Sequence, residues 1–314
     1  MNTAILLFDG VQIIDYTGPW EAFGRRGTVY GVSESGEAIV TSMGMKVVPS
    51  YSIADAPAPD IVVVPGGGNS GEPGPTPYGV GAQLERPAVV DWIRRTAERA
   101  TAVLSVCNGA FLAQRAGLLD GKSATTTASY LAYLAKVAPS TQVVPDRVVD
   151  NGRVITAGGL SSGIDGALHV IERLEGHGAA MQVALGMEYD WQPERAWARA
   201  RLADFHVPPA IYGPIAGAGL QVVDLTSAMD RAHEVYHVAT TSTAAEIVGV
   251  MRENLARAGW ELLPAVAAPA EGDAPGVTVR ARGKDTEGTW VVSANVSPDA
   301  TPGTVLVTVD IRRD

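Results

Sequence analysis

The strongest constraint on the fold is an alternation of buried-strand patterns with helical patterns over residues 1 to about 190. The run DIVVVPGGG (60–68) has four consecutive apolar residues, so a strand there has no polar face and must lie between two helix layers. Further strand patterns occupy 4–8, 37–43, 102–107 and, as a hairpin, 143–159, and helical spacing of apolar residues occurs at 87–100, 110–119, 128–139 and 163–176. This order predicts an α/β fold with a doubly wound, mostly parallel sheet and helices on both faces, as in flavodoxin-like proteins.

A change of sequence texture divides the chain into predicted domains at 1–195 and 223–314. The intervening residues 196–222 are rich in proline and glycine and are expected to form a linker. After them come a β-rich run at 233–241, an amphipathic helix at 243–259 and three alternating strand patterns. The helix has a capping box formed by Thr243 and Glu246. We therefore expect a smaller α+β sandwich in the C-terminal part, with no catalytic constellation of its own.

Composition excludes several classes of partner. The net charge of −10 argues against nucleic acid, because phosphate binding needs a basic face. A single cysteine cannot form an intramolecular disulfide, and the sequence has neither a basic, signal-like start nor an apolar run long enough to span a membrane. The expected protein is cytoplasmic and soluble and has no membrane partner.

The only cysteine, Cys107, stands where an apolar run ends and a helical pattern begins, in TAVLSVCNGAFLAQRAGLLDG (101–121). A residue on such a strand-to-helix turn faces the mouth of the sheet, and Gly109 and Ala110 are small enough for the turn to be tight. Because a helix N-terminus favours the thiolate, we predict a partly ionised nucleophile. The alternative is a buried, inert cysteine, which is common in protein interiors.

Two further stretches are expected to meet Cys107 at the same sheet edge. In VVVPGGG (62–68) a strand ends in glycines, so the backbone N–H groups of Gly67 and Asn108 are predicted to form an oxyanion hole. In DGVQIIDYTGPWEAF (9–23), Asp15 precedes an apparent helix start. It is interpreted either as a helix cap or as an acid/base group near the thiol, with Glu21 as a competing candidate.

These stretches, together with VVDNGRVITAGGLSSGIDGALHVIERLEG (148–176), resemble the ThiJ/PfpI superfamily with its class I glutamine-amidotransferase-like fold, and within it the isocyanide (isonitrile) hydratases. The resemblance spans residues 1 to about 195. It implies a Cys107 nucleophile that attacks the isocyanide carbon, Asp15 as the proton-handling group, and a formamide product. It also implies an orienting role for Gly67 and a homodimer. We expect neither a metal nor a cofactor. The small-molecule substrate is expected to lie against Thr17, Gly66 and Gly159.

Two positions depart from the family pattern. Asn108 stands where the hydratases have threonine, and Thr127 stands where many relatives have histidine. None of the five histidines matches that position, so a Cys–His dyad is not expected and peptide hydrolysis would lack its leaving-group acid. A thiol-based sensor or regulator, and a small-molecule hydrolase or glyoxalase, remain alternatives. Residues 69–83 are interpreted as a loop that either shapes substrate access or is a plain surface insertion.

A second motif, His233-Glu-Val-Tyr-His237, matches the zinc-protease signature H-E-x-x-H. That chemistry needs both histidines one helical turn apart, whereas the surrounding β-branched residues favour a strand. On a strand the two imidazoles would lie about 13 Å apart, too far for one zinc ion. We interpret the match as a coincidence.

Overall fold

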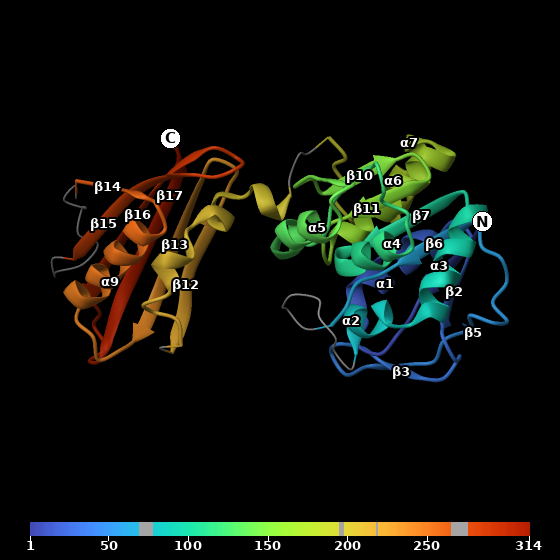
Figure 1. Ribbon diagram of the computed structural model, residues 1–314, viewed down its shortest axis with the longest axis horizontal. Coiled ribbons are helices and arrows are strands. Elements are labelled where there is room, and N and C mark those ends of the chain that lie inside the picture. The colour runs from blue at the N-terminus through green and yellow to red at the C-terminus, as the bar shows by residue number, and fades with distance from the viewer. Residues whose placement is uncertain (69–77, 195–197, 218, 265–275) are drawn as a thin grey trace. The chain divides into compact units, whose positions relative to one another are not determined.

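The computed structural model describes residues 1–68, 78–194, 198–217, 219–264 and 276–314, which divide into two compact units, Met1–Ala200 and Arg201–Asp314 (Figure 1). The first unit is built on a seven-stranded sheet of order β10-β11-β7-β6-β1-β2-β5, parallel except for the β10–β11 hairpin. Its strands are β1 (Asn2–Leu6), β2 (Thr28–Ser33), β5 (Tyr51–Ser52), β6 (Ile61–Val64), β7 (Ala102–Val106), β10 (Val148–Asn151) and β11 (Val154–Ala157).

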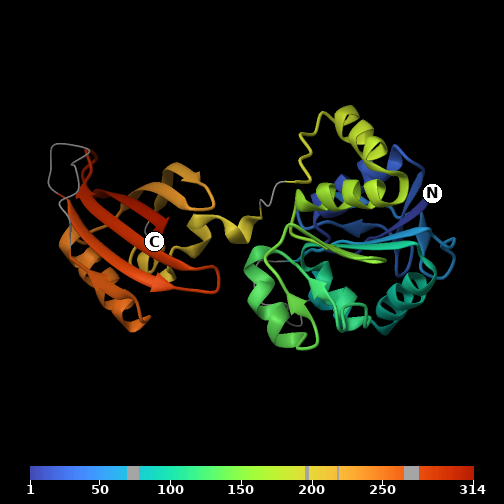
Figure 2. The same ribbon diagram turned by 90° about the horizontal axis from the view of Figure 1, so that it is seen from above.

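Helices cover both faces of this sheet (Figure 2). One layer contains α1 (Ile13–Gly24), α6 (Ser162–Glu175) and α7 (His177–Gly186), and the other contains α2 (Gly79–Leu84), α3 (Pro87–Arg99), α4 (Ala110–Arg115) and α5 (Leu131–Val137). Residues Ile61–Val64 are completely buried between the layers. The predicted doubly wound α/β fold is confirmed. The expected strand at 37–43 is reduced to β3 (Ile39–Val40), because the chain turns at Thr41 to pair with β4 (Lys46–Val47). A further short pair joins β8 (Ser123–Ala124) to β9 (Gln142–Val143).

The second unit is an antiparallel six-stranded sheet of order β12-β13-β17-β16-β15-β14 with a helix on one face. Its elements are α8 (Pro209–Tyr212), β12 (Leu220–Ser227), β13 (Arg231–Ala239), α9 (Ala244–Arg257), β14 (Glu261–Leu263), β15 (Val277–Lys284), β16 (Thr289–Pro298) and β17 (Thr304–Arg313). The capping box is present, with the Glu246 N–H donating to Thr243 Oγ1 and the Thr243 N–H to Glu246 Oε2. The expected α+β architecture is confirmed.

The segment expected as a linker, 196–222, differs from that expectation. From Arg201 onward it belongs to the second unit, where Val207, Ile211 and Ile215 are buried in the core beside α9. Its prolines start the short helix α8 instead of leaving the chain extended, since proline is favoured in a first helical turn. The glycines and prolines of this segment therefore indicate turns within the second unit and not a linker between domains.

Candidate active site

Cys107 lies on a tight turn between β7 and α4. Its φ is +59°, a left-handed conformation that costs a non-glycine residue about 1–3 kcal/mol and that persists only where neighbours hold it. Two hydrogen bonds do so: the Cys107 N–H donates to the Gly158 carbonyl (3.1 Å), and Thr126 Oγ1 donates to the Cys107 carbonyl (2.8 Å). The strand-to-helix turn is the one the sequence predicted.

Glycines let two strand ends converge on this turn. β6 and β7 are parallel neighbours with Val64 opposite Ser105, so the segment after Val64 ends beside Cys107. A Cβ on Gly109 would lie 2.2 Å from the Val64 carbonyl oxygen, and only glycine fits there. The carboxyl edge of the sheet thus brings the PGGG segment and the thiol together as expected.

Asp15 reaches the thiol from the first turn of α1. It is completely buried, and its Oδ2 and Oδ1 accept the N–H groups of Gly66 (3.2 Å) and Leu160 (3.1 Å). Burial raises the pKa of the Asp15 carboxyl to about 7, although hydrogen bonds from Cys107, Gly66 and Leu160 oppose the shift. Of the two sequence interpretations, the cap is wrong, since Gln12 is the N-cap residue. The acid/base position beside Cys107 agrees with the geometry.

The expected ionisation of Cys107 is not what the structure supports. Burial raises the pKa of the Cys107 thiol, and the Asp15 charge raises it further. The hydrogen bonds from Thr127 and the Asn108 N–H act in the opposite direction but are smaller causes. Position at a helix N-terminus was therefore a misleading signal, because the half-buried sulfur next to a carboxylate loses more from desolvation than it gains from the helix.

The oxyanion hole also needs correction. The Gly67 N–H already donates to the side-chain oxygen of Asn108 (2.8 Å), and Asn108 Nδ2 donates back to the Gly67 carbonyl (3.1 Å). The Asn108 N–H points to the Cys107 sulfur. Hence neither N–H is free for a substrate in this conformation. The Asn108 side chain and the Gly67 backbone thus form a closed, reciprocal pair of hydrogen bonds.

Of the other residues that the sequence predicted for the site, one lies beside Cys107 and two do not. Gly66 adjoins the thiol and Asp15, whereas the Thr17 hydroxyl donates to the Ile13 carbonyl (2.8 Å) within its own helix. Thr17 therefore gives no support to a substrate contact. Glu21 is exposed and pairs with Arg25, which removes it as a rival to Asp15.

Thr127 contacts the thiol directly. Its Oγ1 lies 2.6 Å from Cys107 Sγ, and a Cβ on Gly159 would lie 2.7 Å from the same hydroxyl. Thr127 and Gly159 line a cavity of about 220 Å³, whose wall includes the apolar side chains of Leu131, Pro145 and Leu160. Cys107 and Asp15 are not among the residues that line this cavity, which adjoins the thiol through Thr127, so a substrate contact of Gly159 stays a prediction.

Leu160 was missed at the sequence level. It has φ +56°, is half exposed, lines the cavity, and gives its N–H to Asp15. No property of leucine predicts a left-handed backbone. The only available signal was the preceding Gly158-Gly159 pair, which marks a sharp turn.

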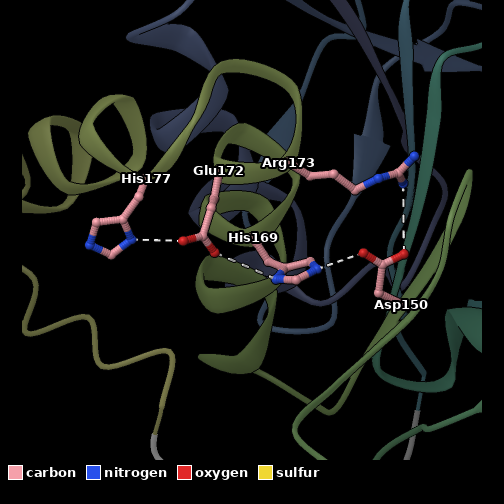
Figure 3. A network of polar contacts seen from close by, with 5 residues as sticks. All are labelled: Asp150, His169, Glu172, Arg173 and His177. Atoms are coloured by element: carbon pink, nitrogen blue, oxygen red, sulfur yellow. Dashed lines mark hydrogen bonds and ion pairs between the residues drawn. The ribbon is translucent and has the colours of Figure 1, made fainter.

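All five histidines, each in a described part of the chain, are paired with carboxylates away from Cys107. In Figure 3, His169 bridges Asp150 and Glu172 on the surface of the first unit, and Glu172 also binds His177. His233 and His237 lie on strand β13, as predicted, and bind Asp310 and Asp299 separately. The remaining histidine, His206, binds Asp285.

Gly66→Ala should disrupt the site without unfolding the chain. An added Cβ would lie 2.3 Å from Asn108 Oδ1, 2.7 Å from Cys107 Cβ and 2.9 Å from Asp15 Oδ2, so it would push apart the groups that the turn assembles. We expect a loss of about 1–3 kcal/mol in the free energy of unfolding, measured in urea. Gly178→Ala in helix α7 is the matched control, since nothing lies near its Cβ. Equal stability of the two variants would contradict the prediction.

The fold and the turn define the class: an α/β protein with a cysteine elbow at the carboxyl edge of a parallel sheet. Residues 1–173, more than half of the chain, match the model of the DJ-1/PfpI family, and the chain belongs to that family. It is 35% identical over 193 residues to the isonitrile hydratase of Pseudomonas putida, covering 60% of this chain and 78% of that protein.

Two solved structures agree with this assignment. A ThiJ/PfpI family protein from Pseudomonas syringae is 27% identical with a TM-score of 0.53, covering 62% of this chain and 77% of that one. Drosophila melanogaster DJ-1beta is 25% identical with a TM-score of 0.52, covering 60% and 98%. Within the described residues, no helix has the length and apolarity needed to cross a membrane. Of the expected access loop 69–83, residues 69–77 lie outside the described part, and α2 begins at Gly79.

Proposed function

We propose that the chain is a cysteine-dependent hydro-lyase that adds water to a small isocyanide and releases an N-substituted formamide. The observation that carries the proposal is the contact between the half-buried Cys107 and the completely buried Asp15, and burial raises the pKa of that carboxyl to about 7. A carboxyl that changes protonation near neutral pH can both accept and return a proton. The similarity to an isonitrile hydratase supports the same conclusion.

The first step forms a bond between the Cys107 sulfur and the terminal isocyanide carbon. The Asp15 carboxylate accepts the thiol proton as the sulfur attacks, and the isocyanide carbon takes it up as negative charge develops there. The product is a thioimidate, Cys107–S–CH=N–R. A thiol of raised pKa suits this route, because the proton leaves only when the substrate carbon is present to accept the sulfur electrons.

The second step consumes water. Asp15 deprotonates a water molecule that adds to the thioimidate carbon, and the nitrogen takes up a proton. The carbon–sulfur bond then breaks, the thiol recovers its proton, and R–NH–CHO leaves, so one water is consumed per turnover. The cavity beside Thr127 holds the R group, and its apolar wall favours alkyl and aryl substituents.

The test is formamide production from a panel of alkyl and aryl isocyanides near pH 7.5, followed by chromatography. We expect saturable turnover, with no formamide from the nitrile isomer of each substrate, because its carbon is already bonded to R and hydration there would give a carboxamide. The absence of formamide from every member would overturn the proposal. Lactate from methylglyoxal would then assign the chain to the glyoxalase alternative.

The sensor alternative is less well supported. Thiol oxidation proceeds through the thiolate, and the raised pKa of Cys107 keeps that form scarce at neutral pH. The homodimer and the cytoplasmic location stay predictions.

A further inference from the structure

The open face of the second unit's sheet carries a groove of about 550 Å³. Helices α8 and α9 pack on the other face, where residues such as Val292 and Val309 form the core (Figure 1). Side chains alternate along a strand, so the neighbours of those core residues point into the open face. These outward-facing side chains line the groove.

Strand register places the groove's polar side chains in two adjacent rows. The first row runs across five strands, and the pairing of each member with the next is direct: Thr226, His233, Asp310, Ser293 and Arg280. In the next row Arg231 lies directly opposite Arg312, which in turn lies opposite Val291. All of these residues line the groove, and they lie on strands β12, β13, β17, β16 and β15.

The arginine pair is electrostatically unfavourable as it stands. Like charges directly opposite on neighbouring strands repel, because their Cβ atoms are only about 5 Å apart. Within the described residues, neither Arg231 nor Arg312 has an ion-pair partner. Two other arginines of this unit do have partners: Arg257 on α9 binds Glu253, and Arg282, which lies opposite Val291 in the same row, binds Asp314. An uncompensated pair is unexpected in residues 201–314, which contain more acidic than basic side chains.

The rest of the groove complements an anion with an apolar body. Arg280 adds a third guanidinium, and the one carboxylate among the lining residues, Asp310, is held by His233 (2.7 Å). Ser293 and Thr226 supply hydroxyl groups in the same row. Val291 forms an apolar floor next to Arg312. Guanidinium groups hold phosphate and carboxylate oxygens through paired N–H donors.

We propose that this groove is a binding site for a small organic anion, whose phosphate or carboxylate group bridges Arg231 and Arg312 while its apolar part lies over Val291. The second unit is thus a ligand-binding module with a site of its own, independent of the thiol. Binding of the anion between them relieves the repulsion between the two arginines.

The experiment uses the full chain with phenyl phosphate, benzoate and inorganic phosphate as probes, in titration calorimetry and thermal unfolding. At least one aromatic probe should bind one per chain and raise Tm. Comparing phenyl phosphate with benzoate identifies the anionic group, and weaker binding of inorganic phosphate identifies the apolar contribution. Arg231→Gln and Arg312→Gln should each weaken binding at least 10-fold. Arg257→Gln, on the other face, should stay within about 2-fold of the wild type.

A second readout separates a binding site from a merely structural role. Without any probe, Arg231→Gln should raise Tm slightly, because it removes the repulsion, while it abolishes the probe-induced rise. Cys107→Ala should bind the probe as the wild type does. The proposal is overturned by a lack of saturable binding for all probes, by equal binding to Arg231→Gln and Arg257→Gln, or by self-association through this face without probe binding.

Discussion

Cys107→Ala should lower the turnover number for isocyanide hydration at least about 1,000-fold, since no other group can form the covalent intermediate. The chain has a single cysteine, so no second thiol can substitute for it. Because the alanine keeps the Cβ, the turn at φ +59° is retained together with its two backbone hydrogen bonds. Formamide release under saturating substrate, measured by chromatography, checks the prediction.

Cys107→Ser is the companion variant, because a hydroxyl retains the hydrogen-bonding capacity toward Asp15 and Thr127 but is a much weaker nucleophile at neutral pH. Both variants should unfold cooperatively in urea, which separates lost chemistry from lost structure. Turnover of either variant within 10-fold of the wild type would exclude the thiol as nucleophile. The Asp15 carboxyl would then have to act on water alone.

The arrangement of the first unit followed from local pattern. Continuous apolar runs such as Ile61–Val64 can only be buried strands, and alternation with amphipathic helices leaves few arrangements besides a doubly wound sheet. In the second unit the same reasoning found β13, α9 and the last three strands but neither the short β14 nor β12, and β12 is exposed along nearly its whole length and has no clear period-two pattern. An edge strand is held by backbone hydrogen bonds, so its side chains need not show a hydrophobic pattern from which the strand could be predicted.

The candidate site was predictable as a set of neighbours but not as a hydrogen-bonded network. Topology alone brings Cys107, Gly66 and Asp15 to one sheet edge. Side-chain geometry then decides which donors are free, and Asn108 occupies the Gly67 N–H that the sequence had assigned to an oxyanion. The thiol pKa likewise depends on burial and on the nearby carboxylate, which helix position does not reveal.

Asp15→Asn should lower the turnover number by about 100- to 10,000-fold and remove the main pH dependence below neutrality. The first step needs the carboxylate as proton acceptor, so the wild-type kcat/KM should rise with pH through about 7, the pKa of Asp15, and then level off. The variant keeps a side chain of nearly the same size with no group that titrates in this range. Initial rates between pH 5 and 9 measure both effects. A wild-type profile that Asp15→Asn leaves unchanged would contradict the assignment.

The same carboxyl should leave a signature in stability that does not depend on any substrate. Its pKa is 3.8 before folding shifts it and about 7 in the folded chain, so the native state binds the extra proton between those values. The stabilising contribution is complete below about pH 3.8 and is lost as pH rises through 7, by up to about 4 kcal/mol. The Asp15→Asn variant has no carboxyl at this position, so it cannot lose this contribution to its free energy of unfolding as pH rises. The wild type should therefore lose free energy of unfolding relative to the variant between pH 5 and 8, measured in urea, because other carboxylates cancel in the comparison. Parallel curves for the two proteins would show that the buried carboxyl is already ionised at pH 5, and proton transfer from Cys107 would then need a different explanation.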